Sequence, residues 1–372
     1  MDKLPIYVNE EKDKFPKELI ENPYRYIQET YERRYPYIGK KIYSFLSLCP
    51  ISLVIPEVII SNNIKTNRTL SMLWLAPPAS GKTKISERFE KISINPISSH
   101  RITPARLIYE IRKTQEDLIS LIISDVAVSF SNDVFVKTVE SIVEEGNVNW
   151  DTMREKDEEV GKGKIRAIAY LSGTPKLISD NRIRDGILGR VFPIISNLTK
   201  EQHKKLIRKM YTGDNDKTDI EDSIENINKY YKKILDMKDQ IDGFIISDEI
   251  KNELGLFVEE NKYLDYIFKK LAIPATRQLE DAFTILASSC FLNIFNRKIE
   301  NNKLVVTKED LEVTIKLVNR GAYYSYSIYD AIERVDWHRV KNERELRNYL
   351  TRTKIEIPKS TKFIMEGIVS GK

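Results

Sequence analysis

The stretch WLAPPASGKT, residues 74–83, decides how the rest of the chain is interpreted. It follows the apolar run LSMLWLA and precedes the amphipathic segment KISERFEKI, so we expect a buried strand, a loop and a helix in that order. That context separates a phosphate-binding loop from a chance Gly-Lys-Thr. Gly81 would let the backbone approach a phosphate closely, Lys82 would supply a cation, and Thr83 would offer a hydroxyl to Mg²⁺. The stretch therefore predicts a site for ATP and Mg²⁺.

Ala76 stands where the first glycine of such a loop normally lies. This position needs a tight turn rather than a phosphate contact, and the two prolines that follow already restrict φ, so the substitution is compatible with function. The alternative interpretation is a turn that only caps a helix. We expect the phosphates to be surrounded by Pro78, Ala79, Ser80, Gly81, Lys82, Thr83 and Lys84.

A second apolar run, DLISLIISD, ends in Asp125. A carboxylate at the end of a strand beside a phosphate loop can bind Mg²⁺ directly or through water, so Thr83 and Asp125 are the predicted metal ligands. The alternative is an aspartate that caps the next turn.

Val126 follows this aspartate, where a hydrolytic site of this kind normally has a glutamate that polarises the attacking water. Three explanations stay open. Ser124 takes the metal-side position while Asp125 acts as the base, or the base comes from elsewhere, as from Glu140 or Glu144, or hydrolysis is slow or absent.

The hydrophobic pattern divides the chain into four parts. Residues 1–66 read as a helical segment, and 67–212 alternate short apolar runs with amphipathic ones, which predicts an α/β unit with a parallel sheet flanked by helices. Residues 213–330 read as an α-helical lid in which Thr307 and Asp310 form a capping box. Residues 331–372 read as a helix-turn-helix segment or a truncated winged helix.

The composition sets limits on partners and location. The 372 residues include 60 Lys and Arg against 55 Asp and Glu, and the net charge of +5 permits nucleic-acid binding without requiring it. Two cysteines without a short spacing suggest neither a disulfide framework nor a zinc site. No apolar run approaches the length of about 20 residues that a membrane span needs, so we expect a cytoplasmic protein without a membrane partner.

The order of the motifs resembles that of the AAA+ ATPases, and most closely the minichromosome maintenance (MCM) replicative helicases and their mobile-element or viral relatives. The resemblance rests on the phosphate loop, the strand ending in Asp125, and three later stretches: EEVGKGKIRAIAYLSGTP, DGILGRVFPI and PATRQLEDAFTILASS. It implies a P-loop AAA+ core followed by a helical lid, and an ATPase that forms a hexameric ring and acts on DNA in replication.

The resemblance also assigns roles to particular residues. Thr174 would be the sensor that faces the γ-phosphate or the attacking water, and Arg190 the arginine finger that reaches the ATP of a neighbouring subunit. Arg277 would contact the γ-phosphate from the lid. Together with Lys82 and Asp125 these make up the predicted catalytic set. For Arg190, the alternative is a surface arginine near a helix end.

A hairpin carrying Lys162, Lys164 and Arg166 is the predicted DNA contact, since cations on a glycine-flanked hairpin can follow a phosphate backbone. The alternative is a solvated charged turn. At the end of the chain, Lys359 and Ser360 begin a segment that reads either as a recognition helix or as an amphipathic helix ending a bundle.

Two other functions stay open beside the DNA motor. The first is a replication initiator or loader that is switched by nucleotide and hydrolyses it weakly, which Val126 favours. The second is an AAA+ protein remodeler that does not bind nucleic acid.

Overall fold

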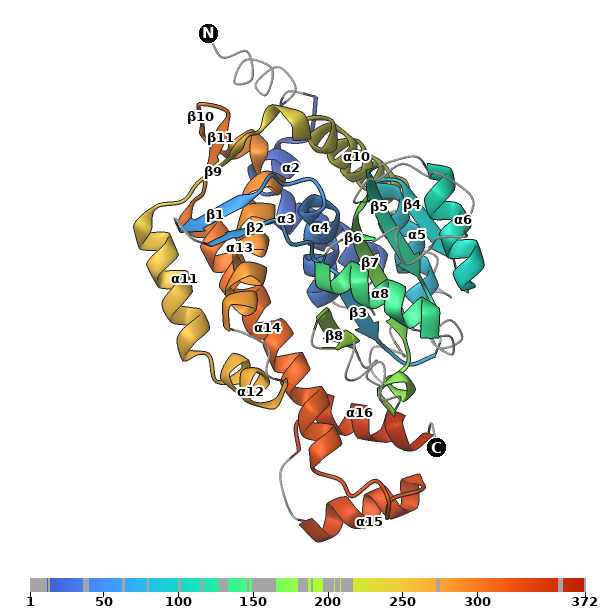
Figure 1. The fold of residues 1–372 in the computed structure, drawn as a ribbon. Helices are drawn as coiled ribbons and strands as arrows, with labels where there is room; N and C mark the ends of the chain where they lie inside the picture. The colour runs from blue at the N-terminus through green and yellow to red at the C-terminus, as the bar shows by residue number, and fades with distance from the viewer. Residues whose placement is uncertain are drawn as a thin grey trace, which may run out of the picture.

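The fold is described from a computed structural model (Figure 1). The structure describes residues 12, 14–35, 40–61, 64–78, 80–99, 102–114, 117–126, 133–145, 147–148, 165–179, 187–188, 190–196, 204, 208, 217–271, 275–353 and 357–370.

A parallel sheet forms the centre of the α/β unit. Its strands, in the spatial order β4-β5-β7-β3-β8, all run parallel to their neighbours. They are β3 (Met72–Leu75), β4 (Pro96–Ser99), β5 (Leu118–Ile123), β7 (Ile165–Gly173) and β8 (Phe192–Ile195). The four residues of β3 are all buried, as expected for a strand covered on both faces. The prediction of a parallel sheet flanked by helices is confirmed.

Among the described residues, three helices connect these strands: α5 (Lys82–Ile92), α6 (Pro104–Thr114) and α8 (Asp133–Glu145). The step from β3 to β4 runs in the opposite direction to the steps from β4 to β5 and from β5 to β7. Right-handed crossovers therefore place α5 on one face of the sheet and α6 and α8 on the other. Figure 1 shows α8 crossing in front of the strands.

The part before the sheet contains the helices α2 (Lys17–Glu21), α3 (Pro23–Arg34) and α4 (Lys40–Ser52). It also contains an antiparallel pair that the sequence pattern did not predict, β1 (Val58–Ser61) and β2 (Ile64–Thr66). α4 packs against α3 and against a helix of the C-terminal part, so the N-terminal helices join the sheet unit to the lid.

In the part predicted to be an all-helical lid, residues 217–271 and 275–330 contain five α-helices and a small sheet. The helices are α10 (Lys217–Asp236), α11 (Asp248–Glu260), α12 (Lys262–Leu271), α13 (Ala275–Leu292) and α14 (Lys308–Glu333). The sheet contains β9 (Gly243–Ile245), β10 (Ile299–Glu300) and β11 (Lys303–Val305). The predicted capping box begins α14, where the Asp310 carboxylate accepts from the backbone N–H of Thr307 at 3.1 Å.

The last two helices are α15 (Glu343–Thr353) and α16 (Lys359–Ser370). α16 packs on α14 and on the 3-10 turn η2 (Pro175–Ser179), which directly follows β7. The contact with η2 is tight, because a Cβ on Gly367 would lie 2.2 Å from the Cβ of Pro175. The last helix is therefore fitted against the turn that follows Thr174.

The start of α16 faces α14 more than solvent. The Ser360 hydroxyl lies 2.8 Å from the hydroxyl of Ser327 and donates to the Tyr323 hydroxyl at 3.1 Å. Ser360 is thus used in packing rather than presented to a DNA groove, whereas Lys359 and Lys362 are exposed. Among the helices that the structure describes, none combines the length and apolar character that a membrane span requires.

Candidate nucleotide-binding site

The phosphate loop leaves the sheet beside β7. The backbone N–H of Ala76 donates to the carbonyl of Gly173 at 3.0 Å, which ties the start of the loop to the end of its neighbouring strand. Gly81 precedes α5 with φ 87° and ψ 14°, a left-handed conformation in which a side chain would be strained. The first N–H groups of α5 have no partner within the helix and face the loop, as in helix N-termini that bind anions.

Ala76 does not need to be a glycine in this loop. Among the described residues, the non-glycine residues with positive φ are Asn95, Asn301 and Asn302, so the φ of Ala76 is in the ordinary negative range. Its side chain is fully buried and its carbonyl accepts a hydrogen bond from Lys82 at 3.0 Å. The position therefore requires a small residue with ordinary backbone geometry.

Lys82 folds back over the loop. Its Nζ donates to the carbonyl of Pro77 at 2.6 Å as well as to that of Ala76. Burial lowers the pKa of Lys82 to about 8, and the opposing attraction of Asp125 only partly offsets this. An anion bound at the helix start would offer this ammonium group a stronger acceptor than the two carbonyls.

The strand register brings Asp125 and Thr174 to the same edge of the sheet. Ile123 is level with Leu171, and Leu75 is level with Gly173, so the next residues of all three strands emerge together. Asp125 is half-buried, and it is close enough to Lys82 to favour the charged form of the lysine. Thr174 is half-buried directly after β7. Lys82, Asp125 and Thr174 thus gather at the carboxyl ends of β3, β5 and β7.

A serine that sequence reasoning did not single out fixes the spacing of two of these strand ends. The Ser172 hydroxyl donates to the carbonyl of Ser124 at 2.8 Å, one residue before Asp125. Beside it, Gly173 has no room for a side chain, because a Cβ would lie 2.0 Å from Cδ1 of Leu177. The signal in the sequence was a Ser-Gly pair that closes an otherwise apolar strand.

The other predicted loop residues take different environments. Ser80 is buried, Thr83 is half-buried in the first turn of α5, and Pro78 is exposed. Lys84 is exposed and its Nζ pairs with a carboxylate oxygen of Glu87 at 2.9 Å, so its side chain is directed to the surface. Ala79 lies outside the described residues.

Val126 is buried beside the end of β7. It is fully buried, and its Cγ2 would lie 3.4 Å from a Cβ on Gly173. A glutamate in this position would bury its carboxylate against the end of β7, which is costly without a partner. In this backbone, position 126 is a packing position, and Asp125 is the acid next to Lys82.

Glu140 and Glu144 are poorly placed as alternative bases. Both belong to α8, which leads into β6 (Asn147–Val148), and β6 pairs with the first residues of β7. The end of α8 therefore lies toward the amino edge of the sheet, where Leu118 of β5 is seven residues, or about 23 Å, from Asp125. The prediction that either glutamate acts as the base is not supported by this topology.

Arg190 and Arg277 lie away from the Lys82 edge. Arg190 precedes Phe192, which is level with Met72, the first residue of β3, so Arg190 is at the amino edge of the sheet. It lines a small cavity of about 60 Å³ together with Gln278, the residue after Arg277. The structure therefore brings Arg190 close to the first turn of α13, but it does not bring either element to Lys82.

Arg166 is not a hairpin cation, which corrects the predicted DNA contact. It belongs to β7, and its guanidinium donates to the backbone carbonyls of Ile55 at 2.8 Å, Asn67 at 2.9 Å and Ser52 at 3.1 Å. Burial lowers the pKa of Arg166 to about 10. Its role is to bind the N-terminal segment to the sheet.

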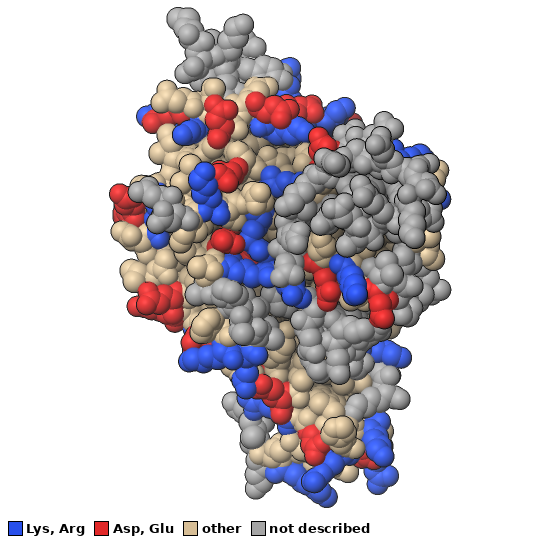
Figure 2. All heavy atoms as spheres, in the orientation of Figure 1, with Lys and Arg blue, Asp and Glu red and all other residues tan. Residues whose placement is uncertain are grey.

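The hairpin itself is defined by its two strands. β6 pairs antiparallel with β7, with Val148 opposite Ile165, and the intervening residues 149–164 lie outside the described part of the chain, together with Lys162 and Lys164. Figure 2 shows cationic and anionic side chains interspersed over the described residues of one face, without a large basic patch.

Comparison with models of known protein families gave no match, and comparison with curated proteins gave none either. Within the described ranges, no group of three or more His, Cys, Asp or Glu side chains is arranged to hold a metal ion. A single carboxylate with a hydroxyl is, however, the donor set with which Mg²⁺ is held when phosphates complete its coordination, and Asp125 and Thr83 fit that description.

The lowered pKa of Lys82 predicts how nucleotide binding depends on pH. A bound phosphate favours the ammonium form and raises this pKa above 8, so binding takes up a proton. Affinity is therefore expected to be constant below pH 8 and to fall by up to about tenfold per pH unit above it. Titration calorimetry from about pH 6.5 to 9.5, in buffers that differ in ionisation enthalpy, measures the affinity and the number of protons taken up. Equal affinities across this range would contradict the role of Lys82.

Proposed function

We propose that the chain is an AAA+ ATPase of the MCM-like type that binds ATP with Mg²⁺ at the loop around Lys82, assembles as a ring and moves or remodels DNA. The observation that carries the proposal is the gathering of Lys82, Asp125 and Thr174 at the carboxyl ends of three parallel strands. Ligands of open α/β sheets bind at this edge.

In this proposal each group of the chain has one task. The N–H groups at the start of α5 and the Lys82 ammonium bind phosphate oxygens, while Thr83 and Asp125 hold the metal. Bound ATP and Mg²⁺ would supply a γ-phosphoryl group activated toward attack by water. Thr174, held one residue beyond Gly173, orients that water through its hydroxyl.

The separation of Arg190 and Arg277 from Lys82 supports assembly. Arg190 and the first turn of α13 adjoin one another away from the Lys82 edge of the same chain. A ring in which this part of one subunit meets the Lys82 edge of the next would complete each site with an arginine finger.

DNA binding in the proposal depends on Lys162 and Lys164, since Arg166 is used within the fold. The antiparallel pairing of β6 and β7 places residues 149–164 between the two strands of a hairpin. In a ring these hairpins would lie together, and their lysines would contact a phosphate backbone.

Weak hydrolysis is the second candidate, and the burial of Val126 favours it. With position 126 turned into the core, the water-activating group has to be Asp125 itself or a group from a neighbouring subunit. An initiator or loader that is switched by ATP binding needs no fast turnover. A protein remodeler remains the third possibility, for which DNA would have no effect.

ATP turnover with and without DNA tests the proposal. We expect wild-type turnover to rise in the presence of single-stranded or duplex DNA, and DNA affinity to fall steeply with salt. ATP binding without turnover would replace the motor by the switch. Turnover that is insensitive to DNA, with no salt-dependent DNA binding, would favour the remodeler, and absence of ATP binding would refute all three.

A further inference from the structure

Helix α15 presents a face of exposed polar side chains at one end of the molecule (Figure 1). Leu346 is buried and Leu350 is half-buried, as expected for the side of an amphipathic helix that packs on its neighbours. The side chains of the other side recur three or four positions apart and are all exposed. They are Arg344, Arg347, Asn348, Thr351 and Arg352. None of these five is acidic, and we call this surface the outer face of α15.

The net charge of the chain is concentrated at this end. Residues 334–372 contain ten Lys and Arg against five Asp and Glu, an excess that equals the net charge of +5 of the whole chain. The preceding 333 residues are therefore balanced in charge. Figure 2 shows Lys and Arg side chains along the outer edge of the end that carries α15.

The acids of α15 are used within the segment itself. The Glu345 carboxylate accepts from the backbone N–H of Lys341 at 2.7 Å, so it is held at the start of the helix. Glu343 pairs with Arg347 at 3.2 Å, on the side of the outer face that borders α16.

Arg344 and Arg352 are different, because the described residues include no ion-pair partner for either of them. They lie eight residues, or about 12 Å, apart along the outer face. Two guanidinium groups are therefore free to bind an anionic partner at the two ends of this face.

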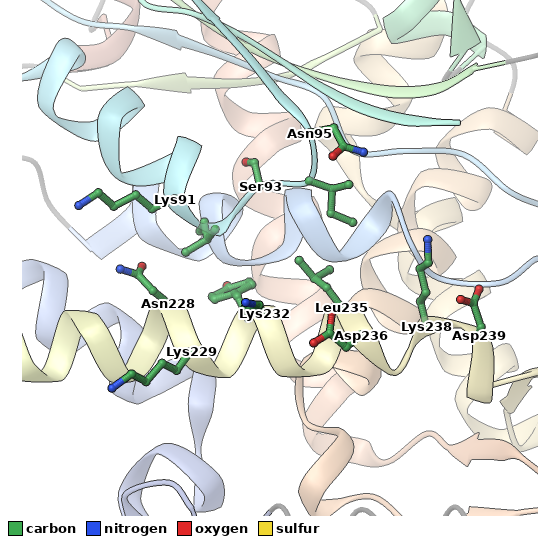
Figure 3. Close-up of a pocket in the computed structure, with 13 residues that line it drawn as sticks. Lys91, Ser93, Asn95, Asn228, Lys229, Lys232, Leu235, Asp236, Lys238 and Asp239 are labelled. Atoms are coloured by element: carbon green, nitrogen blue, oxygen red, sulfur yellow. The ribbon is translucent and has the colours of Figure 1, made fainter. Parts of the chain in front are cut away.

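The cleft between the end of α5 and α10 shows the opposite arrangement. It has a volume of about 670 Å³, but Lys232 lies beside Asp236 there, and Lys91 is directed away from it (Figure 3). Mixed charges of this kind do not favour an anion. The outer face of α15, in which arginines occur without an acid, is the better surface for one.

The shape and side chains of α15 fit the major groove of duplex DNA. That groove is about 12 Å wide and admits an α-helix, whereas the major groove of duplex RNA is too narrow for one. Arginine binds phosphate oxygens or guanine, and the amide of asparagine pairs with adenine. The cations do not have to converge, because the phosphates of a duplex are spread along both sides of the groove.

We propose that the outer face of α15 binds duplex DNA in the major groove, with Arg344 and Arg352 on phosphates and Asn348 toward the bases between them. The start of α16 is not used in this contact, because Ser360 is packed on α14. The contact shares its partner with the proposed function but not its residues. It requires neither the hairpin lysines nor ATP.

The experiment measures the affinity of the full chain, without nucleotide, for a labelled duplex of about two helical turns by fluorescence anisotropy. Arg344→Gln with Arg352→Gln is expected to weaken duplex binding by about tenfold or more. The slope of log affinity against log salt should become less steep by about two, since two phosphate contacts are lost. Glutamine retains helix propensity, and melting temperatures verify that each variant is folded. Unchanged duplex affinity in the double variant would overturn the proposal.

Lys308→Gln with Lys316→Gln is the matched control. These two lysines are exposed on α14 at the same spacing of eight residues, and they pair with Glu249 and Glu312. The control removes the same charge and should leave duplex affinity unchanged. An equal loss in the control, or equal affinity of the wild type for a single strand, would also overturn the proposal, since neither depends on a helix in the major groove.

Lys162→Ala with Lys164→Ala separates this contact from the hairpin. Duplex binding that survives these two changes and is lost with Arg344 and Arg352 would support the α15 contact, even in a chain that does not turn over ATP. Binding that depends on the hairpin lysines alone would overturn the α15 contact and leave the proposed function intact.

Discussion

The Lys82→Ala variant is expected to bind ATP at least about 100-fold more weakly than the wild-type chain and to lose turnover. The ammonium group is the cation that the structure places at the start of α5, 2.6 Å from the Pro77 carbonyl and beside Asp125. A hydrogen bond to a charged group contributes about 1.5–3 kcal/mol, and a lysine that spans two phosphates forms more than one. Its removal also takes away the cation beside Asp125.

Lys84→Ala is the matched control for this prediction. Lys84 lies two residues further along α5, is exposed, and pairs with Glu87, so its loss changes net charge equally without touching the site. ATP should raise the melting temperature of the wild type and of Lys84→Ala but not that of Lys82→Ala. Equal stabilisation of all three by ATP would mean that the Gly-Lys-Thr turn only caps a helix.

Local sequence signals were sufficient where the structure depends on near neighbours. The run MLWL predicts a strand because its residues are all apolar, and Gly81 marks the left-handed residue before α5. Thr307 and Asp310 predict the start of α14 for the same reason, since a capping box is made within four residues. The parallel sheet followed from the alternation of such segments.

The errors arose where contacts join residues far apart in the sequence. The resemblance places Arg166 on the hairpin with Lys162 and Lys164, yet its partners Ser52 and Ile55 are more than 100 positions away. Nothing in the local pattern could show that its guanidinium would be hydrogen-bonded to backbone carbonyls. Likewise, the burial of Val126 depends on its packing near Gly173, on another strand.

Short strands were also beyond the sequence pattern. β1 and β2 have four and three residues, and β10 has two, which is too few for an alternation of apolar and polar side chains to be recognised. Such strands are specified by the surface they pack on. The part of the candidate site that uses one loop and two strand ends could be predicted from the sequence. The positions of Arg190 and Arg277 relative to that loop could not, because they depend on the packing of the lid.

Asp310→Ala is expected to give the largest loss of stability, about 3–5 kcal/mol, although it lies far from the nucleotide site in the sequence. The carboxylate is fully buried and receives two hydrogen bonds from Arg297, at 2.8 and 2.9 Å, and one from the Ser289 hydroxyl at 2.9 Å. These partners belong to α13 and to the segment before β10, whereas Asp310 itself is in the first turn of α14. Removing the acid takes the main counter-charge from the Arg297 guanidinium, whose side chain is only 5% exposed.

Glu309→Ala provides the comparison, because Glu309 adjoins Asp310 and also lies near Arg297, at 3.5 Å, but is 83% exposed. A pair with one solvated partner contributes at most about 1 kcal/mol, so the two neighbouring substitutions should differ severalfold in their effect on the urea midpoint. Combining Asp310→Ala with Arg297→Ala should cost less than the sum of the single changes, since the double variant leaves no unpaired charge. Equal midpoints for the Asp310 and Glu309 variants would show that the buried pair does not hold α13 and α14 together, because the burial of the carboxylate is what distinguishes the two sites.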